Sequence, residues 1–213
     1  MRQLNIGICG LGTVGSGVLS VLQNNADIIR EKSSCLIHVT HVATRNTNHG
    51  CNVENIQFSN DIFEVARDSD IDLVVELIGG TSSALELVML AISNGKHVVT
   101  ANKALIAEHG TRILQAAYEA NVIVAFEASV AGGIPILKSI REGLVANKIN
   151  WLAGIINGTT NFILSEMSSK GRSFESVLEE AQKRGYAEAD PTFDIEGIDA
   201  SQNCLLYTSP SPR

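Results

Sequence analysis

A glycine-rich turn directly follows the first apolar run of this sequence and constrains its fold more than any other feature. Residues 4–9 are apolar and predict a short strand, after which Gly10, Gly12 and Gly15 give the spacing G-x-G-x-x-G. The first glycine of such a turn allows a tight bend, the second lets backbone approach a pyrophosphate, and the third lets a helix pack closely on a strand. A helix beginning at Thr13 and Val14 directs free N–H groups at phosphates. The turn therefore predicts a dinucleotide-binding domain.

Strand-like and helix-like segments alternate through the first 130 residues. The apolar pattern predicts further strands over 36–43, 71–77, 97–100 and 122–126, and helices over 14–30, 61–68, 82–94 and about 103–120, with Gly95 as a C-terminal cap. Strands separated by helices pair in parallel through right-handed crossovers. We therefore expect the α/β class, with a Rossmann-type doubly wound parallel sheet over residues 1–130.

The pattern changes after residue 130. Glycines at 132 and 133 break the strand, and Pro135 suits the first turn of a helix that runs to about residue 144. A strand over 149–156 and helices over 157–169 and 173–184 are expected next, followed by a helix from about residue 198. These elements predict the beginning of an incomplete α+β substrate domain over residues 131–203.

The last ten residues, 204–213, are rich in serine and proline and interrupt the helix expected from residue 198. They resemble the translation of a sequencing-library adapter, so we expect a non-native tail and exclude it from functional reasoning. A natural tail of this composition is the alternative.

Composition excludes several classes of protein. A net charge of -7 argues against nucleic-acid binding, which needs a basic surface. No apolar run approaches the roughly 18 residues of a membrane span, and we expect no secretory leader before the first strand. The four cysteines lack C-x-x-C spacing, which favours a reducing cytoplasmic location.

The end of the second predicted strand bears on the choice of cofactor. NAD-selective folds place an acidic residue there to bind the ribose 2′-hydroxyl, whereas this chain has Ala43, Thr44 and Arg45. Arg45 can pair with a 2′-phosphate, so the sequence favours NADP over NAD. Arg45 as an ordinary solvated charge stays open.

Five further motifs, in this order and spacing, resemble homoserine dehydrogenases. The resemblance covers residues 3–202, and the motifs are Val-Val-Glu-Leu-Ile-Gly-Gly-Thr at 74–81, Gly-Lys-His-Val-Val-Thr-Ala-Asn-Lys-Ala-Leu at 95–105, Phe-Glu-Ala-Ser-Val-Ala-Gly-Gly-Ile-Pro at 126–135, Gly-Ile-Ile-Asn-Gly-Thr-Thr-Asn at 154–161 and Gly-Tyr-Ala-Glu-Ala-Asp-Pro-Thr-Phe-Asp-Ile-Glu-Gly-Ile-Asp-Ala at 185–200.

The resemblance implies hydride transfer between NAD(P) and a small substrate, interconverting L-homoserine and L-aspartate 4-semialdehyde on the route to threonine, methionine and isoleucine. It places Lys103 at the nicotinamide and the substrate, where reduction of an aldehyde leaves negative charge on oxygen. It also implies that Glu188 binds the substrate, whose ammonium group suits a carboxylate, and that Asp194 and Asp199 lie at the catalytic centre. A solvated acidic loop is the ordinary alternative for these residues.

A monovalent cation, sodium, is also implied by the resemblance. The positions that match its ligands are the Glu127 carboxylate and the carbonyls of Val130, Gly132 and Ile134. Hard cations take oxygen ligands of this kind. Family members further form homodimers through the substrate domain.

One position departs from the family. Where family members carry a lysine that donates a proton to the substrate, this chain has Asn203, and an amide cannot deliver a proton as an ammonium can. We therefore expect negligible dehydrogenase activity from the chain as written.

Three rival functions follow from the same sequence. A sugar or cyclitol dehydrogenase would carry Glu-Lys-Pro where this chain has Asn102-Lys103-Ala104, and an aspartate-semialdehyde dehydrogenase would need a nucleophilic cysteine in its second half. Cys9 beside the glycine turn is instead expected to pack in the core. A non-catalytic NAD(P)-binding module stays open.

Overall fold

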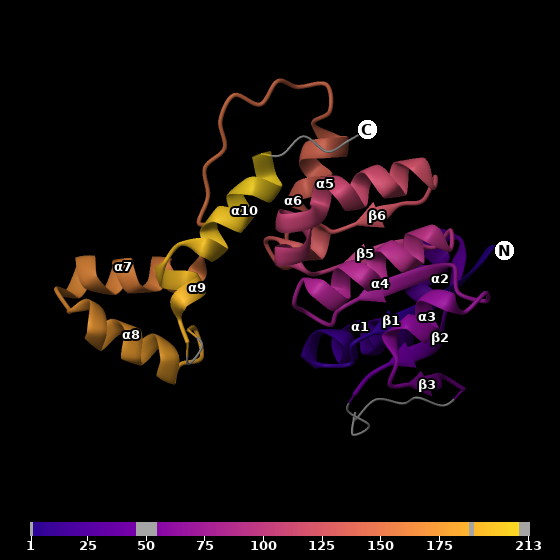
Figure 1. The fold of residues 1–213 in the computed structure, drawn as a ribbon. Coiled ribbons are helices and arrows are strands. Elements are labelled where there is room, and N and C mark those ends of the chain that lie inside the picture. Colours follow the sequence, from indigo (N-terminus) through magenta and orange to yellow (C-terminus); the bar gives the residue numbers. More distant parts are fainter. Residues whose placement is uncertain (1, 46–54, 188–189, 209–213) are drawn as a thin grey trace. The chain divides into compact units, whose positions relative to one another are not determined.

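The protein forms two compact units in a computed structural model that describes residues 2–45, 55–187 and 190–208 (Figure 1). The first unit extends to Gly133 and the second begins at Ile134. Each unit has its own secondary structure and is described by itself.

A six-stranded sheet forms the centre of the first unit. Its strands are β1 (Arg2–Cys9), β2 (Cys35–Ala43), β3 (Gln57–Ser59), β4 (Leu73–Glu76), β5 (His97–Thr100) and β6 (Val124–Ala125). They pair in parallel in the order β3-β2-β1-β4-β5-β6. The chain leaves β1 toward β2 and later returns to its other side with β4, so the strand order reverses at β1. The predicted doubly wound parallel sheet is confirmed, and the reversal marks the edge where such folds bind ligands.

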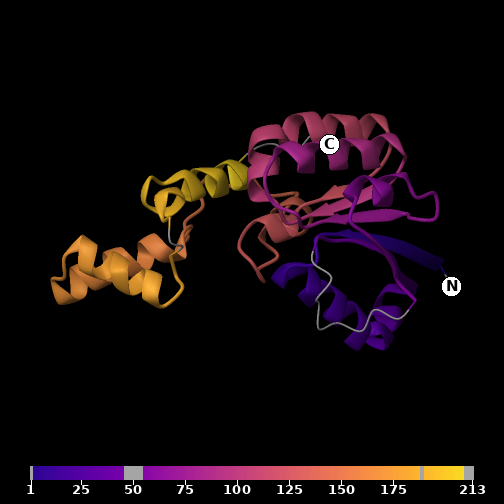
Figure 2. The same cartoon turned by 60° about the horizontal axis from the view of Figure 1, so that its bottom comes forward.

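Helices cover both faces of this sheet. They are α1 (Thr13–Asn24), α2 (Ala26–Ser33), α3 (Ile62–Arg67), α4 (Ser82–Ser93) and α5 (Lys103–Glu119), followed by the 3-10 turn η1 (Glu127–Ser129). Figure 2 shows α1 and α2 on one face and α4 and α5 on the other. On the first face Leu19 of α1 packs among Ile8, Val42 and Val75 of three strands, all buried. Burial on both faces explains why these strands are continuous apolar runs rather than alternating ones.

Two details of the first unit differ from expectation. The helix predicted over 14–30 is two helices, α1 and α2, which meet at Asn25, whose φ of -111° and ψ of 18° leave the helical region. The apolar spacing continues across this break, but asparagine competes for backbone hydrogen bonds and favours helix ends. Strand β3 was not predicted, because three residues are too few to establish a period.

The described part of the second unit consists of helices and irregular segments. These helices are α6 (Ile136–Lys138), the π-helical turn η2 (Ser139–Gly143), α7 (Gly158–Lys170), α8 (Phe174–Lys183), α9 (Thr192–Ile195) and α10 (Ile198–Thr208). Helices α7 and α8 form a hairpin, with Gly171 at φ 62° ending α7 and the Ser173 side chain capping α8. Arg172 in the turn pairs with Glu166 of α7 and Glu180 of α8, which joins the two helices.

Two predictions for the second unit are wrong. Residues 149–156 form no strand; they are irregular, and Trp151 and Ile155 are 80% and 73% exposed. The described residues of this unit supply no neighbouring strand, and a lone strand leaves its backbone groups unpaired. Helix α10 is not interrupted at Cys204 but continues to Thr208. The segment 204–208 precedes both prolines of the tail, so nothing in its backbone stops the helix.

Among the described residues, no helix combines the length and the apolar character needed to cross a membrane.

Candidate active site

The glycine turn lies at the carboxyl edge of the sheet, between the end of β1 and the start of α1. The Gly10 N–H donates to the Ala43 carbonyl at the end of β2 (2.8 Å), and the Leu77 N–H donates to the Cys9 carbonyl (2.8 Å). Gly12 is the N-cap of α1 and has no side chain to satisfy the first N–H groups of the helix. Thr13 and Val14 open that helix, and Val14 is 58% exposed. The turn thus presents unpaired helix N–H groups to solvent, as anion binding requires.

The three glycines of the turn differ in their surroundings. A Cβ atom on Gly15 would lie 2.0 Å from the Gly10 carbonyl oxygen, and one on Gly10, whose φ is +99°, would lie 2.6 Å from the Leu77 carbonyl oxygen. A Cβ on Gly12 would meet nothing within 4 Å. Two glycines therefore allow backbone to pack on backbone, and the third leaves open the space where a pyrophosphate would approach. This arrangement fits a dinucleotide.

Arg45 lies at the same edge. It is exposed and follows the end of β2 by two residues, and the carbonyl at that strand end accepts the Gly10 N–H. Arg45 thus follows closely the strand end to which the phosphate turn is hydrogen-bonded, on the β2 side of the switch point.

Lys103 is the first residue of α5, at the carboxyl end of β5, and is half-buried. The preceding Asn102 caps this helix by accepting the Leu105 N–H (3.0 Å), and its Nδ2 donates to the Gly80 carbonyl (2.6 Å). Lys103 therefore stands on a helix start that is fixed to the neighbouring loop, on the other side of the switch point from Arg45.

The Cys9 side chain is fully buried at the end of β1. Burial, reinforced by the charges of Glu76 and Asp61, raises the pKa of its thiol far above the ordinary range. A thiol that stays protonated is a poor nucleophile, so Cys9 is a core residue, as expected from the sequence.

The second unit brings two of the predicted catalytic carboxylates together. The Asn157 Nδ2 donates to Asp194 Oδ1 (2.7 Å) and to Asp199 Oδ2 (3.0 Å), while its Oδ1 caps α7 by accepting the Thr160 N–H (2.7 Å). Asn157 is buried and both aspartates are half-buried. One amide thus holds two acidic side chains from α9 and α10, which creates a negative site suited to an ammonium group.

Asn203 completes this cluster. Its Nδ2 donates to the Ile156 carbonyl (3.0 Å) and to Asp199 Oδ2 (3.1 Å), whereas its buried Oδ1 has no hydrogen-bond partner among the described residues. The neighbours of the Asn203 side chain, the Ile156 carbonyl and the Asp199 carboxylate, are both acceptors. The Oδ1 of Asn203 is a further acceptor, and it finds no donor among the described residues. A side chain with donors only, such as lysine, would satisfy the same acceptors and leave no orphan.

Sequence reasoning missed Asn157, although a signal was available. Asparagine three residues before the amide that it caps, in Asn-Gly-Thr-Thr, is the pattern of a helix N-cap. Glu188 lies outside the described residues. Asp190 is described, and hydrogen bonds from the Thr192 side chain and backbone lower its pKa.

The residues predicted to bind sodium lie in a continuous loop at the end of the first unit. Glu127 is half-buried in η1, the Val130 N–H closes that turn on the Glu127 carbonyl (3.5 Å), and Ala131 and Gly133 have positive φ values of 44° and 82°. Gly132 lies between them and Ile134 opens the second unit. The Ile134 carbonyl already accepts the Ile136 N–H (2.8 Å), and its second lone pair together with the other oxygens of the set suits a hard cation.

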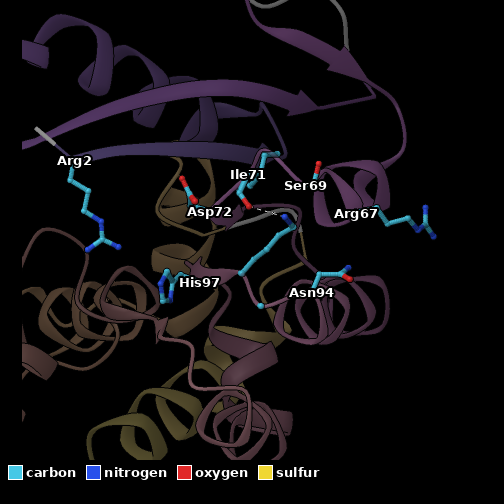
Figure 3. Close-up of a pocket in the computed structure, with 9 residues that line it drawn as sticks. Arg2, Arg67, Ser69, Ile71, Asp72, Asn94 and His97 are labelled. Carbon is cyan, nitrogen blue, oxygen red and sulfur yellow. Dashed lines mark hydrogen bonds between the residues drawn. The ribbon is translucent and has the colours of Figure 1, made fainter.

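A separate hollow of about 440 Å³ opens at the opposite, amino edge of the sheet (Figure 3). Three of its polar side chains are already engaged: Lys96 Nζ donates to the Asp68 and Ile71 carbonyls, the Asp72 carboxylate accepts the Asn5 N–H, and His97 Nδ1 accepts the Ile123 N–H. Arg2 and Arg67 lie at opposite ends of the hollow in Figure 3 and do not converge. The hollow is therefore built from structural contacts and is not the active site.

Comparison with known proteins agrees with this geometry. The family profile described as "Homoserine dehydrogenase, NAD binding domain" matches residues 10–127, and the profile "Homoserine dehydrogenase" matches residues 135–210. The chain belongs to the homoserine dehydrogenase family. The first match begins at Gly10 of the phosphate turn and includes Lys103.

Individual homoserine dehydrogenases are similar over nearly the whole chain. The enzyme of Pseudomonas aeruginosa is 60% identical over 209 residues, which are 98% of this chain and 48% of that protein. The crystal structure of a homoserine dehydrogenase from Thiobacillus denitrificans is 53% identical with a TM-score of 0.91, over 100% of this chain and 51% of that one. A hyperthermophilic archaeal homoserine dehydrogenase in complex with NADPH is 25% identical with a TM-score of 0.83, over 99% and 72%. This chain spans about half the length of the curated homoserine dehydrogenases it matches.

Proposed function

We propose that this chain is part of a homoserine dehydrogenase that interconverts L-homoserine and L-aspartate 4-semialdehyde with NADP. The observation that carries the proposal is the phosphate turn, closed by backbone at Gly10 and Gly15 and open at Gly12, at the same sheet edge as Lys103. We place the enzyme in the cytoplasm as a homodimer. The three described cysteines are not in disulfide bonds, in keeping with a reducing compartment.

The bound dinucleotide supplies or accepts the hydride at its nicotinamide ring. On the protein side, the N–H groups at the start of α1 bind the pyrophosphate. The Lys103 ammonium stabilises the negative charge that develops on the carbonyl oxygen. Glu188 binds the substrate, whose ammonium group suits a carboxylate, and Asp194 and Asp199 act at the catalytic centre. Because Asn203 cannot donate a proton, the protonation step has no donor at that position.

The preference for NADP is tested by titrating NADPH and NADH separately into the chain. We expect tighter binding of NADPH, because Arg45 pairs with the 2′-phosphate in a charge-assisted bond worth roughly 1.5–3 kcal/mol. Arg45→Ala should then weaken NADPH binding by about tenfold or more and leave NADH binding unchanged. Equal losses for both cofactors would contradict this role.

The cation is tested by thermal unfolding in sodium chloride and in choline chloride at equal ionic strength. Sodium bound by Glu127 and the carbonyls of Val130, Gly132 and Ile134 should raise Tm in a concentration-dependent way, because a ligand stabilises the state that binds it. Glu127→Gln should abolish the difference between the salts, and a difference that persists would place the cation elsewhere.

A non-catalytic NAD(P)-binding module is a second candidate, and Asn203 favours it. We expect NADPH binding without turnover of aspartate 4-semialdehyde by the chain as written. Turnover at the rate of complete family members would contradict the expectation. Asn203→Lys supplies donors to the Ile156 carbonyl and Asp199, so any turnover gained by this variant alone would assign the loss to position 203.

A further inference from the structure

Glu76 is a fully buried carboxylate at the end of β4. It pairs in register with Cys9 of β1 on one side and with Thr100 of β5 on the other. The residue therefore lies at the carboxyl edge, next to the phosphate turn. Burying a carboxylate costs several kcal/mol unless it is hydrogen-bonded, so its contacts carry the explanation.

Both carboxylate oxygens of Glu76 hold loops of this edge. Oε1 accepts the Ile78 N–H (2.9 Å) in the loop between β4 and α4, and Oε2 accepts the hydroxyl of Thr100 (2.5 Å), which is also fully buried. The Thr100 Oγ1 in turn accepts the Asn102 N–H (3.0 Å). The Asn102 Nδ2 then donates to the Gly80 carbonyl, which lies in the same loop between β4 and α4 as Ile78.

The direction of these bonds follows from what each side chain can donate and accept. A threonine hydroxyl has one proton, and an ionised carboxylate can only accept it. With the proton given to Glu76, the Thr100 oxygen is left to accept the Asn102 N–H. An amide at position 76 would keep its oxygen for the Ile78 N–H and turn its NH₂ toward Thr100, so that the hydroxyl would face two donors.

We propose that Glu76 is a positioning residue for the nicotinamide half of the site: through Thr100 and Asn102 it fixes the loop 77–81 and the start of α5, and thereby places Lys103. The inference rests on the proposed function. In a doubly wound sheet the two halves each bind one nucleotide across the switch point. Arg45 marks the adenosine half beside β2, whereas Glu76, Thr100 and Lys103 belong to the half formed by β4 and β5.

The test compares two ligands by isothermal titration calorimetry. NADPH spans both halves, whereas 2′-phospho-ADP-ribose has the adenosine and pyrophosphate parts and lacks nicotinamide. For Glu76→Gln we expect about tenfold weaker NADPH binding, the effect of losing one charge-assisted bond, and unchanged binding of 2′-phospho-ADP-ribose. Glu86→Gln, which changes an exposed glutamate of α4, is the matched control and should bind both ligands as the parent does.

Equal weakening of both ligands would mean that Glu76 serves only the stability of the unit and would overturn the proposal, as would unchanged NADPH binding. If Glu76→Gln does not fold, Thr100→Val and Thr100→Ser decide the question. Valine removes the hydroxyl at nearly constant shape and should weaken NADPH alone, while serine retains the hydroxyl and should restore binding; equal behaviour of the two refutes the proposal. A parent chain that binds no NADPH would refute the proposed function itself, and this inference with it.

Discussion

Replacing Gly15 and Gly12 separately by alanine tests whether the phosphate turn is shaped by packing or by its ligand. The two residues are three positions apart in one turn and differ in what an added methyl group would meet. At Gly15 the Cβ would lie 2.0 Å from the Gly10 carbonyl oxygen and 3.0 Å from its carbon, whereas at Gly12 it would meet nothing within 4 Å. Alanine is therefore expected to reduce stability at position 15 and to reduce NADPH binding at position 12.

The magnitude follows from the overlap. Ordinary contact begins near 3.4 Å, so the Gly15 Cβ overlaps the carbonyl oxygen by about 1.4 Å, and the obstacle is backbone that cannot rotate aside. Overpacking of this kind costs typically 1–3 kcal/mol, and we place Gly15→Ala at about 3 kcal/mol. For a chain of this size that corresponds to a decrease in Tm on the order of 10 °C. Gly12, at φ -79° and ψ -158°, has a conformation that alanine adopts freely, so Gly12→Ala should stay within about 1 kcal/mol of the parent.

Circular dichroism during thermal unfolding measures the change in Tm, and fluorescence titration measures the affinity for NADPH. Gly12→Ala should keep the parent's Tm and bind NADPH at least about tenfold more weakly, because the methyl group occupies the space left for the pyrophosphate. A Gly15→Ala protein as stable as the parent would refute the packing argument. Undiminished NADPH binding by Gly12→Ala would refute the assignment of that open space to the cofactor.

Two further predictions concern stability. Asn157→Ala removes a helix cap and the donor shared by two carboxylates, so it should lower the free energy of unfolding by about 3 kcal/mol in urea titrations. Ser173→Ala removes a helix cap alone and should lower it by about 1 kcal/mol. Equal losses for the two variants would contradict the role of the shared donor. Burial raises the pKa of Asp68, but three groups lower it: the Asp70 N–H by a hydrogen bond, His41 by a hydrogen bond and its charge, and Lys96 by its charge. Their combined effect outweighs burial and brings the pKa of Asp68 below 3.8. The stabilisation is complete above 3.8 and is lost as pH falls through the folded-state pKa. Asp68→Asn should therefore flatten the decline in stability as pH falls below 3.8, whereas Glu86→Gln serves as the matched surface control.

The sequence predicted the sheet because its signals are local and strong. Each of the main strands is an apolar run, and the glycines of the phosphate turn have a spacing that few other structures require. The failures have equally specific causes. Residues 149–156 have the apolar character of a strand, but a strand needs a partner, which their own composition does not supply. Asn25 ends a helix within a spacing that continues past it.

The candidate site was predictable residue by residue but not as a set of bonds. Lys103, Asp194 and Asp199 were named from motifs, whereas the amide of Asn157 that joins the two aspartates depends on where α7 begins relative to α9 and α10. Glu76 could have been noticed, because a charge directly after the apolar residues 73–75 has to be paired if the strand is buried. Its partner Thr100 is 24 residues away, and only the strand order brings them together.

Trp151 gives the irregular apolar segment a practical consequence. It is the single tryptophan of the sequence, and four-fifths of its surface is open to solvent. An indole so exposed is expected to emit as it would in water, so unfolding should change its spectrum little, whereas a protein surface that covers this segment should shift the emission toward the blue. The chain thus carries a built-in optical reporter of whatever covers that segment, which requires no label.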